Sequence, residues 1–244
     1  LAVDPDRTFK RVEAVLETNV TDPEAVVAQG PANLTRGRGV DRRTLSDTLG
    51  LESASLAGTN VTLGSRDVPL SWLAEGRVDG VGNVYLHSAP GMGSGVTRLL
   101  TAHEFVHYAQ LQTDATARVA RAVPTGTTDG RWALRSVVEG AAVYATDAYV
   151  DRYGGPDAEP NAALYDRLND TLRPGSVAWH ANLAYVDGRD YVGERVGTAS
   201  GLSVVYDSPP RTSEQVIHGL SPVEEPAAPL DVTTSGDEWR VAAT

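Results

Sequence analysis

The chain has 244 residues, no cysteine, and a formal net charge of −11 from 21 basic and 32 acidic side chains. This length allows one large domain with a substantial core, and the lack of cysteine excludes disulfides and thiolate metal sites. So acidic a surface argues against nucleic acid as a partner. The chain contains no run of about 18 apolar residues, so we expect no membrane span within it.

The basic residues and the sequons say more about the environment. Lys10 is the single lysine, and acid-rich, lysine-poor chains are expected of proteins that work in concentrated salt. We therefore expect a halophilic, haloarchaeal source. N-glycosylation sequons begin at Asn19, Asn33, Asn60 and Asn169, which favours an extracellular or cell-surface protein.

The first part of the chain predicts short elements. We expect helices over residues 4–16, from residue 21 through 27, and over 41–51, then turns and short strands over 57–79. Residues 81–87 form the best predicted strand. We expect it at the edge of a sheet beside the catalytic cleft, mainly structural, with one side open to an extended substrate.

The second part predicts helices joined by loops. Helical patterns cover residues 96–112, 115–122, 132–149, 162–172 and 189–202. The glycine-rich stretch before the first of them lacks the phosphate-binding patterns, so it is a connector. We expect an α+β fold in a single domain over residues 1–220. Its α/β portion spans 1–95, its helical portion 96–220, and 221–244 is a tail or linker.

An H-E-x-x-H motif lies within the first of these helices. His103 and His107 are four residues apart, so they project from one helical face and can reach one zinc ion. Glu104 occupies the position of the general base in such sites. The longer metzincin pattern fails, since Gln110 and Thr113 replace its glycine and third histidine.

A catalytic zinc site needs a third protein ligand. Glu139 stands alone in an apolar helical stretch, where a carboxylate is costly unless it is paired or bound to metal. Asp147 is the rival, eight residues later near the same helical face. An aspartate ligand would make the site similar to that of the aspzincins.

The surroundings of these residues resemble a known family. The stretch V-V-E-G-A-A-V-Y around Glu139 resembles the third-ligand helix of the gluzincin metallopeptidases. Residues 207–218 resemble the P-P-x-S-T-E-Q-x-L-H segment of uncharacterised prokaryotic gluzincin-like proteins, whose H-E-[LF]-x-H-x-x-Q stretch is matched through Gln110. Two departures are Val143, where the family often has an acidic outer partner, and Gly219, where a proline is usual. Asp147 is then an alternative outer partner.

The resemblance implies a zincin-like fold, with Zn²⁺ held by His103, His107 and Glu139, and a peptide or protein substrate. The group that stabilises the oxyanion is expected downstream, with His218 first, then Tyr206 and Tyr191. Alternatively, the segment that carries Glu214 and His218 only caps and anchors the helical half. His87 and His180 are interpreted as structural or surface residues.

The main functional hypothesis is therefore a zinc-dependent metallopeptidase. One alternative is a catalytically weak or inactive zincin-fold domain with a binding or structural role at the cell surface. Another is a zinc hydrolase that acts on a non-peptide amide.

Overall fold

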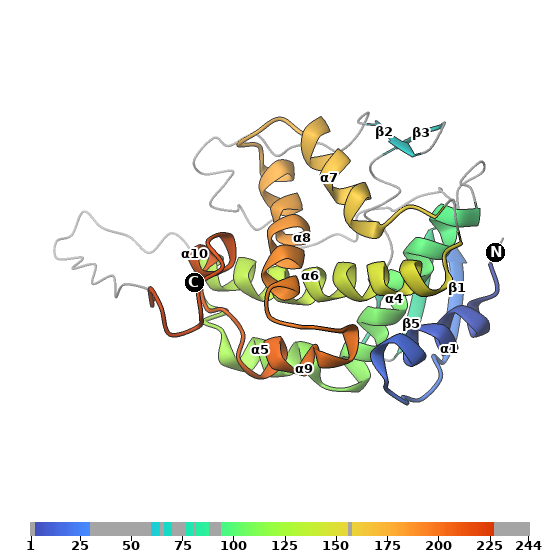
Figure 1. The fold of residues 1–244 in the computed structure, drawn as a ribbon, viewed down its shortest axis with the longest axis horizontal. Helices are drawn as coiled ribbons and strands as arrows, with labels where there is room; N and C mark the ends of the chain where they lie inside the picture. Colours follow the sequence, from blue (N-terminus) through green and yellow to red (C-terminus); the bar gives the residue numbers. More distant parts are fainter. Residues whose placement is uncertain are drawn as a thin grey trace, which may run out of the picture.

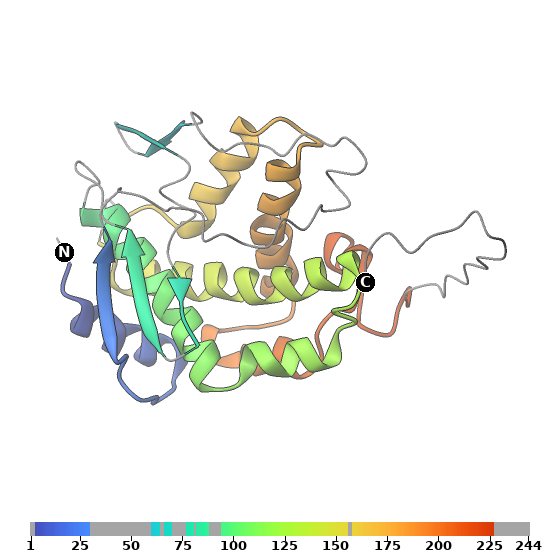
Figure 2. The same ribbon diagram turned by 180° about the vertical axis from the view of Figure 1, so that it is seen from behind.

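The computed structural model describes residues 3–29, 60–63, 66–69, 77–80, 82–87, 94–155 and 158–226. These parts are mainly helical and include two small sheets, so the broad α+β prediction is confirmed (Figures 1 and 2). The helix expected over residues 41–51 lies outside the described residues, as does the tail beyond residue 226.

The first helix, α1 (Pro5–Leu16), forms as predicted. The side chain of Asp4 accepts a hydrogen bond from the backbone N–H of Arg7 at 3.1 Å, and Pro5 occupies the first turn, where it loses no helical bond. Phe9 packs edge-on against Phe105 and Tyr108, with ring centroids 5.2 and 5.7 Å apart. These aromatic contacts fix α1 against the helix that carries the H-E-x-x-H motif.

The larger sheet has the strand order β1-β5-β4. β1 (Ala25–Gln29) runs parallel to β5 (Asn83–His87), and β4 (Arg77–Val78) pairs with β5 antiparallel. Alternate residues Val84 and Leu86 are buried, on the face that α4 and α1 cover (Figure 2). β2 (Asn60–Leu63) and β3 (Arg66–Pro69) form a separate antiparallel pair.

Two predictions for this sheet are wrong. Residues 25–29, expected to continue a helix, form strand β1, because the β-branched pair Val26 and Val27 is aligned with β5 along the whole strand. β5 is also not an edge strand: within the described residues it is the central one, and β1 and β4 flank it.

Three helices follow the sheet: α4 (Ser94–Gln112), α5 (Ala115–Ala122) and α6 (Thr128–Tyr153). All three were predicted, and α6 extends beyond the expected range at both ends. It begins after Thr127, whose hydroxyl accepts from the N–H of Gly130 at 2.9 Å. Figure 1 shows α6 crossing the molecule, with α7 and α8 on one side and α5 and α9 on the other.

The remaining helices complete the second half. They are α7 (Asn161–Thr171), α8 (Val177–Gly193), the 3₁₀ turn η1 (Ala199–Gly201), α9 (Ser203–Asp207) and α10 (Ser213–Ile217). The prediction of a continuous helix over residues 189–202 is wrong. The helix starts earlier, at the Ser176 cap, and ends at Gly193.

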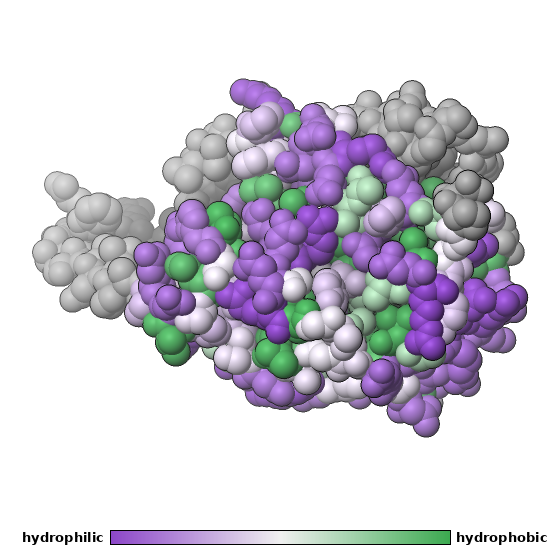
Figure 3. Space-filling model, in the orientation of Figure 1, coloured by the Kyte–Doolittle hydropathy of each residue, from purple (hydrophilic) through white to green (hydrophobic). Residues whose placement is uncertain are grey.

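The surface seen in Figure 3 is mainly hydrophilic, with apolar side chains in small separate patches. Among the helices in the described parts of the chain, none is both long and apolar enough to cross a membrane.

Candidate metal centre

The three predicted ligand residues meet between α4 and α6. Nε2 of His107 lies 3.1 Å from Nε2 of His103 and 3.0 Å from Oε2 of Glu139, and the third distance, His103 to Glu139, is 3.5 Å. Three corners of a tetrahedron with zinc–ligand bonds near 2.0–2.1 Å are about 3.3 Å apart. The described residues contain no other group of this kind, and its spacing fits one metal ion.

The charges of the group favour a bound cation. Burial lowers the pKa of His103. Burial alone would also lower the pKa of His107, but the carboxylate of Glu139 raises it to about 9. Burial opposes ionisation of Glu139, yet His107 and His103 together hold the pKa of that carboxyl well below its usual range. An ionised Glu139 therefore faces a His107 that carries a proton, and a bound cation would take the place of that proton beside the carboxylate.

Each histidine has a partner on its other ring nitrogen. Nδ1 of His107 lies 2.8 Å from Oε1 of Gln110, whose Nε2 donates to the carbonyl of Val138 at 2.8 Å. Gln110 thus ties His107 to the residue just before Glu139. Nδ1 of His103 lies 2.9 Å from the side-chain amide of Asn161, a fully buried residue at the start of α7. The oxygen of Gln110 accepts from Nδ1 of His107 and leaves Nε2 of that ring free for a metal, whereas at His103 the same arrangement requires the amide of Asn161 turned so that its unpartnered Oδ1 faces Nδ1.

Asp147 is not beside the ligand atoms. Its carboxylate accepts a hydrogen bond from the N–H of Ala162 at 3.1 Å, at the first turn of α7. Burial raises its pKa to about 6. The structure therefore gives Asp147 no place as the third ligand, but it holds the helix end that presents Asn161 to His103. Val143, at the family's usual outer acidic position, is buried in the core.

Helices α6 and α8 cross at two glycines, and this crossing positions Tyr185 in the site. A methyl group on Gly140 would lie 2.2 Å from the backbone of Gly188, so α6 and α8 touch through their main chains. Tyr185, one turn before Gly188, is thereby brought beside Glu139. Its ring stacks on Tyr165, with centroids 4.2 Å apart, and lies 6.4 Å from the ring of His103.

Tyr185 and Arg135 form the side of the site next to Glu139. Burial, with the nearby charge of Glu139, raises the pKa of Tyr185 well above its usual value, so its hydroxyl stays protonated. The guanidinium of Arg135 lies over the Tyr185 ring at 5.4 Å and donates a long hydrogen bond of 3.4 Å to its hydroxyl. Neither residue is predicted from the sequence. Their spacing from Glu139 and Gly188 becomes meaningful only once the helix crossing is known.

Glu104 is buried next to His103. Its Oε2 has no hydrogen-bond partner in the described structure, although the side chain is only 7% exposed. Burial raises the pKa of this carboxyl to about 7. A buried acid without a partner is costly, so its presence here is a signature of a functional site.

Comparison with known proteins adds no assignment. No family model matches the chain, and no significant match occurs among curated proteins or solved structures.

The three residues expected to stabilise an oxyanion lie elsewhere. The hydroxyl of Tyr206 accepts from Nε2 of Gln110 at 3.1 Å, so Tyr206 is separated from His107 by that glutamine. Tyr191 is buried in the core, where Arg195 covers its ring at 3.5 Å. His218 is 60% exposed and pairs with Glu214 at 3.1 Å.

Residues 211–215, just before His218, are anchored by several hydrogen bonds. The hydroxyl of Thr212 caps α10, and the buried amide of Gln215 bonds the backbone of Arg211 and Glu224 at 2.6 Å each. Ser213 bonds Asp129, nearly three turns before Glu139 and about 15 Å away along the helix axis. These contacts support the anchoring alternative for this segment.

The other two histidines are placed as follows. His180 is exposed and stacks on Trp132 with ring centroids 5.6 Å apart. His87 is the last residue of β5, and its side chain lies outside the described part of the structure.

Proposed function

We propose that this chain is a zinc-dependent metallopeptidase of the gluzincin type, with a zincin-like fold, that hydrolyses peptide bonds. The observation that carries the proposal is the approach of His103, His107 and Glu139 to within 3.5 Å of one another, beside the unpartnered carboxylate of Glu104. A pair of histidines and a carboxylate is the ligand set of several catalytic zinc sites, which keep a further position open.

The accessibility of the group supports a catalytic rather than a closed structural site. The side chains of His107 and Glu139 are 17% and 20% exposed, while that of His103 is buried. One side of the ligand group therefore faces solvent, from which a substrate can approach. When bound there, zinc supplies Lewis acidity that activates a water nucleophile and polarises the scissile carbonyl.

Glu104 moves the protons of the reaction. Its Oε2 atom has no hydrogen-bond partner among the described residues, so it is available to accept a proton from the attacking water. The same carboxyl then returns that proton to the leaving amine. Burial keeps Glu104 away from competing solvent during both transfers.

Tyr185 and Arg135 stabilise the negative charge that develops on the substrate carbonyl. Tyr185 keeps its proton and its hydroxyl interacts with Glu139, so donation to the developing oxyanion requires that hydroxyl to turn from Glu139 toward the substrate. The guanidinium of Arg135 adds a positive charge on the same side. We prefer this assignment to His218, Tyr206 and Tyr191 because Tyr185 and Arg135 interact with the carboxylate of Glu139.

The test is hydrolysis of a peptide library in concentrated salt, with and without a chelator, and with measured zinc content. We expect one zinc per chain and loss of activity with the chelator, restored by added zinc. Glu104→Gln should retain zinc and lose about a hundredfold or more in rate. Glu159→Gln, which removes an exposed acid paired with Arg167, is the matched control and should keep full activity.

Three results would redirect the proposal. Full activity in Glu104→Gln with zinc bound would exclude this mechanism. A wild-type chain that holds zinc tightly but cleaves no peptide would instead support a binding or structural domain. Cleavage of non-peptide amides alone would support the third hypothesis.

We also propose an extracellular or cell-surface location in concentrated salt. The net charge of −11 with a single lysine motivates the salt, and the sequons motivate the location. Among the described sequon asparagines, Asn19 is exposed in the loop after α1, whereas the side-chain oxygen of Asn169 is buried in α7. Mass spectrometry of the native protein should find a glycan on Asn19, and an unmodified protein in the cytosolic fraction would contradict the location.

A further inference from the structure

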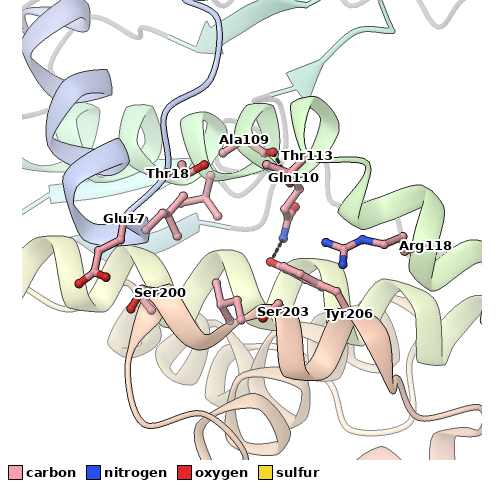
Figure 4. A pocket seen from close by; sticks show the side chains of 13 residues that line it. Glu17, Thr18, Ala109, Gln110, Thr113, Arg118, Ser200, Ser203 and Tyr206 are labelled. Atoms are coloured by element: carbon pink, nitrogen blue, oxygen red, sulfur yellow. Dashed lines mark hydrogen bonds between the residues drawn. The ribbon is translucent and has the colours of Figure 1, made fainter.

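A cavity of about 200 Å³ lies against α4, on a face adjacent to the one that carries His103 and His107. Its walls come from the end of α1, from α4, and from η1 and α9, and Arg118 enters it from α5 (Figure 4). All of its lining residues belong to the described part of the chain. Gln110 lines this cavity and also bonds His107, so one side chain borders both sites.

One end of the cavity presents hydrogen-bond donors without acceptors. The hydroxyl of Tyr206 receives a bond from Gln110, so its own proton remains to be donated. Nε of Arg118 is buried and has no hydrogen-bond partner. Figure 4 shows the guanidinium of Arg118 directed toward Gln110 and Tyr206, and its charge centre lies 5.9 Å from the Tyr206 ring. Buried donors of this kind normally have partners, so the two together indicate a missing acceptor.

The rest of the wall combines aliphatic side chains with small polar ones from Thr18, Thr113, Ser200 and Ser203. Leu16, Val106, Ala109 and Leu202 line it, and these side chains accept a short hydrocarbon group but offer no polar contact. The expected ligand therefore has an acceptor at one end and a small branched or straight aliphatic part at the other.

The charges around the cavity select the type of acceptor. Arg118 carries a positive charge, its NH1 pairs with Asp207 at the surface, and no described hydrogen bond uses its Nε. Glu17 lies on the far rim as an exposed acid, which disfavours a ligand with several negative charges. A single carboxylate fits this balance, since charge-assisted bonds to arginine and tyrosine hydroxyl are stronger than neutral ones.

We propose that this cavity is a binding site for a small aliphatic monocarboxylate, held by Arg118 and Tyr206. The site does not depend on the bound metal or on peptidase activity. Such a carboxylate can come from a free short-chain acid or from the α-carboxylate of an apolar amino acid. Both carry the same charged group and a similar hydrocarbon part.

The test is calorimetric titration of the full chain, in concentrated salt, with 4-methylpentanoate, its amide, leucine and leucinamide. We expect one site per chain for 4-methylpentanoate and binding at least about tenfold weaker for its amide, because the charge-assisted bonds are lost. If leucine binds and leucinamide does not, the amino acid is the source. If only the acid without an amino group binds, the source is a free short-chain acid.

Three variants locate the site. Arg118→Gln and Tyr206→Phe should each weaken 4-methylpentanoate binding by about tenfold, with an unchanged circular dichroism spectrum. Arg121→Gln, on the same helix but 64% exposed and paired with Asp114, should bind as the wild type does. If the acid and its amide bind equally, or the first two variants bind as tightly as the third, the proposal is wrong. The proposal would also be wrong if no binding is detected at millimolar ligand, or if added chloride abolishes the binding of 4-methylpentanoate completely.

Discussion

Asn161 contacts His103 across two helices, with 2.9 Å between its side-chain amide and Nδ1 of the imidazole. The asparagine is fully buried at the start of α7, and the carboxylate of Asp147 bonds the backbone of the next residue, Ala162. A ligand on α4 is therefore oriented by a residue that the end of α6 holds in place. The proposed metal site therefore depends on the docking of α7 as well as on α4 and α6.

Asn161→Ala should weaken zinc binding by about 10- to 100-fold, because His103 loses the partner that keeps Nε2 directed at the metal. Competition with a chromophoric chelator measures this affinity directly, without a substrate. Asn169→Ala, two turns later on α7, is the control and should bind zinc as the wild type does. Equal affinities in both variants would show that Asn161 only fills space.

Tyr185→Phe should lower kcat by about 10²- to 10³-fold and leave zinc content unchanged, as expected for removal of one oxyanion donor. Tyr191→Phe, on the same helix with its hydroxyl in the core, is the matched variant and should keep the wild-type rate. Steady-state kinetics on the best library peptide gives both values. If Tyr191→Phe lowers kcat and Tyr185→Phe does not, the oxyanion donor is Tyr191, as one of the predictions from the sequence has it, and the assignment to Tyr185 is wrong.

Gly140→Ala should lower the free energy of unfolding by about 1–3 kcal/mol or more, because the added methyl would lie 2.2 Å from the backbone of Gly188. Chemical denaturation in concentrated salt measures the change. Gly193→Ala provides the comparison, since a methyl there meets only the Tyr144 ring at 3.6 Å and should be neutral or mildly stabilising. If both variants are equally stable, α6 and α8 are not in main-chain contact.

Asp147 should make the stability of the protein depend on pH. Its folded pKa of about 6 lies above the ordinary value of 3.8, so the folded state binds this proton more tightly than the unfolded state. Its contribution to the free energy of unfolding is therefore present below about pH 4, declines as the pH rises to about 6, and is constant above that.

Asp147→Asn removes this dependence while an amide oxygen can still accept from Ala162. The difference in unfolding free energy between wild type and variant, measured by denaturation from pH 4 to 7, should change in that window. Asp170→Asn, which removes an exposed acid near the end of α7, should give a difference that does not change there. Parallel curves for wild type and Asp147→Asn would contradict the proposed shift.

High salt should stabilise the chain. The net charge of −11 causes mutual repulsion in the compact state, and added salt screens it. Thermal unfolding in increasing KCl should therefore give a rising Tm up to molar concentrations. A Tm that is independent of salt would argue against a halophilic protein.

Much of this structure is encoded locally. The apolar spacing, the Asp4 and Thr127 caps and the H-E-x-x-H pattern predict helices, and these patterns depend on neighbours within one or two turns. Strand β1 was mistaken for a helix for a related reason. The signal from Asp22 and Pro23 is local, but the partner of Val26 and Val27 is β5, some 58 residues away in the chain.

The sequence by itself determined the types of the proposed ligand residues, the spacing of His103 and His107 on one face, and Glu139 as a lone acid in an apolar helix. Only the tertiary structure decided which distant groups serve them. Asn161 rather than Asp147 contacts His103, and Tyr185 rather than Tyr206 or His218 lies beside Glu139. The physical reason is that these neighbours depend on where helices cross. The crossing at Gly140 and Gly188 depends on main-chain contact between residues almost 50 positions apart, which no periodicity in the sequence records.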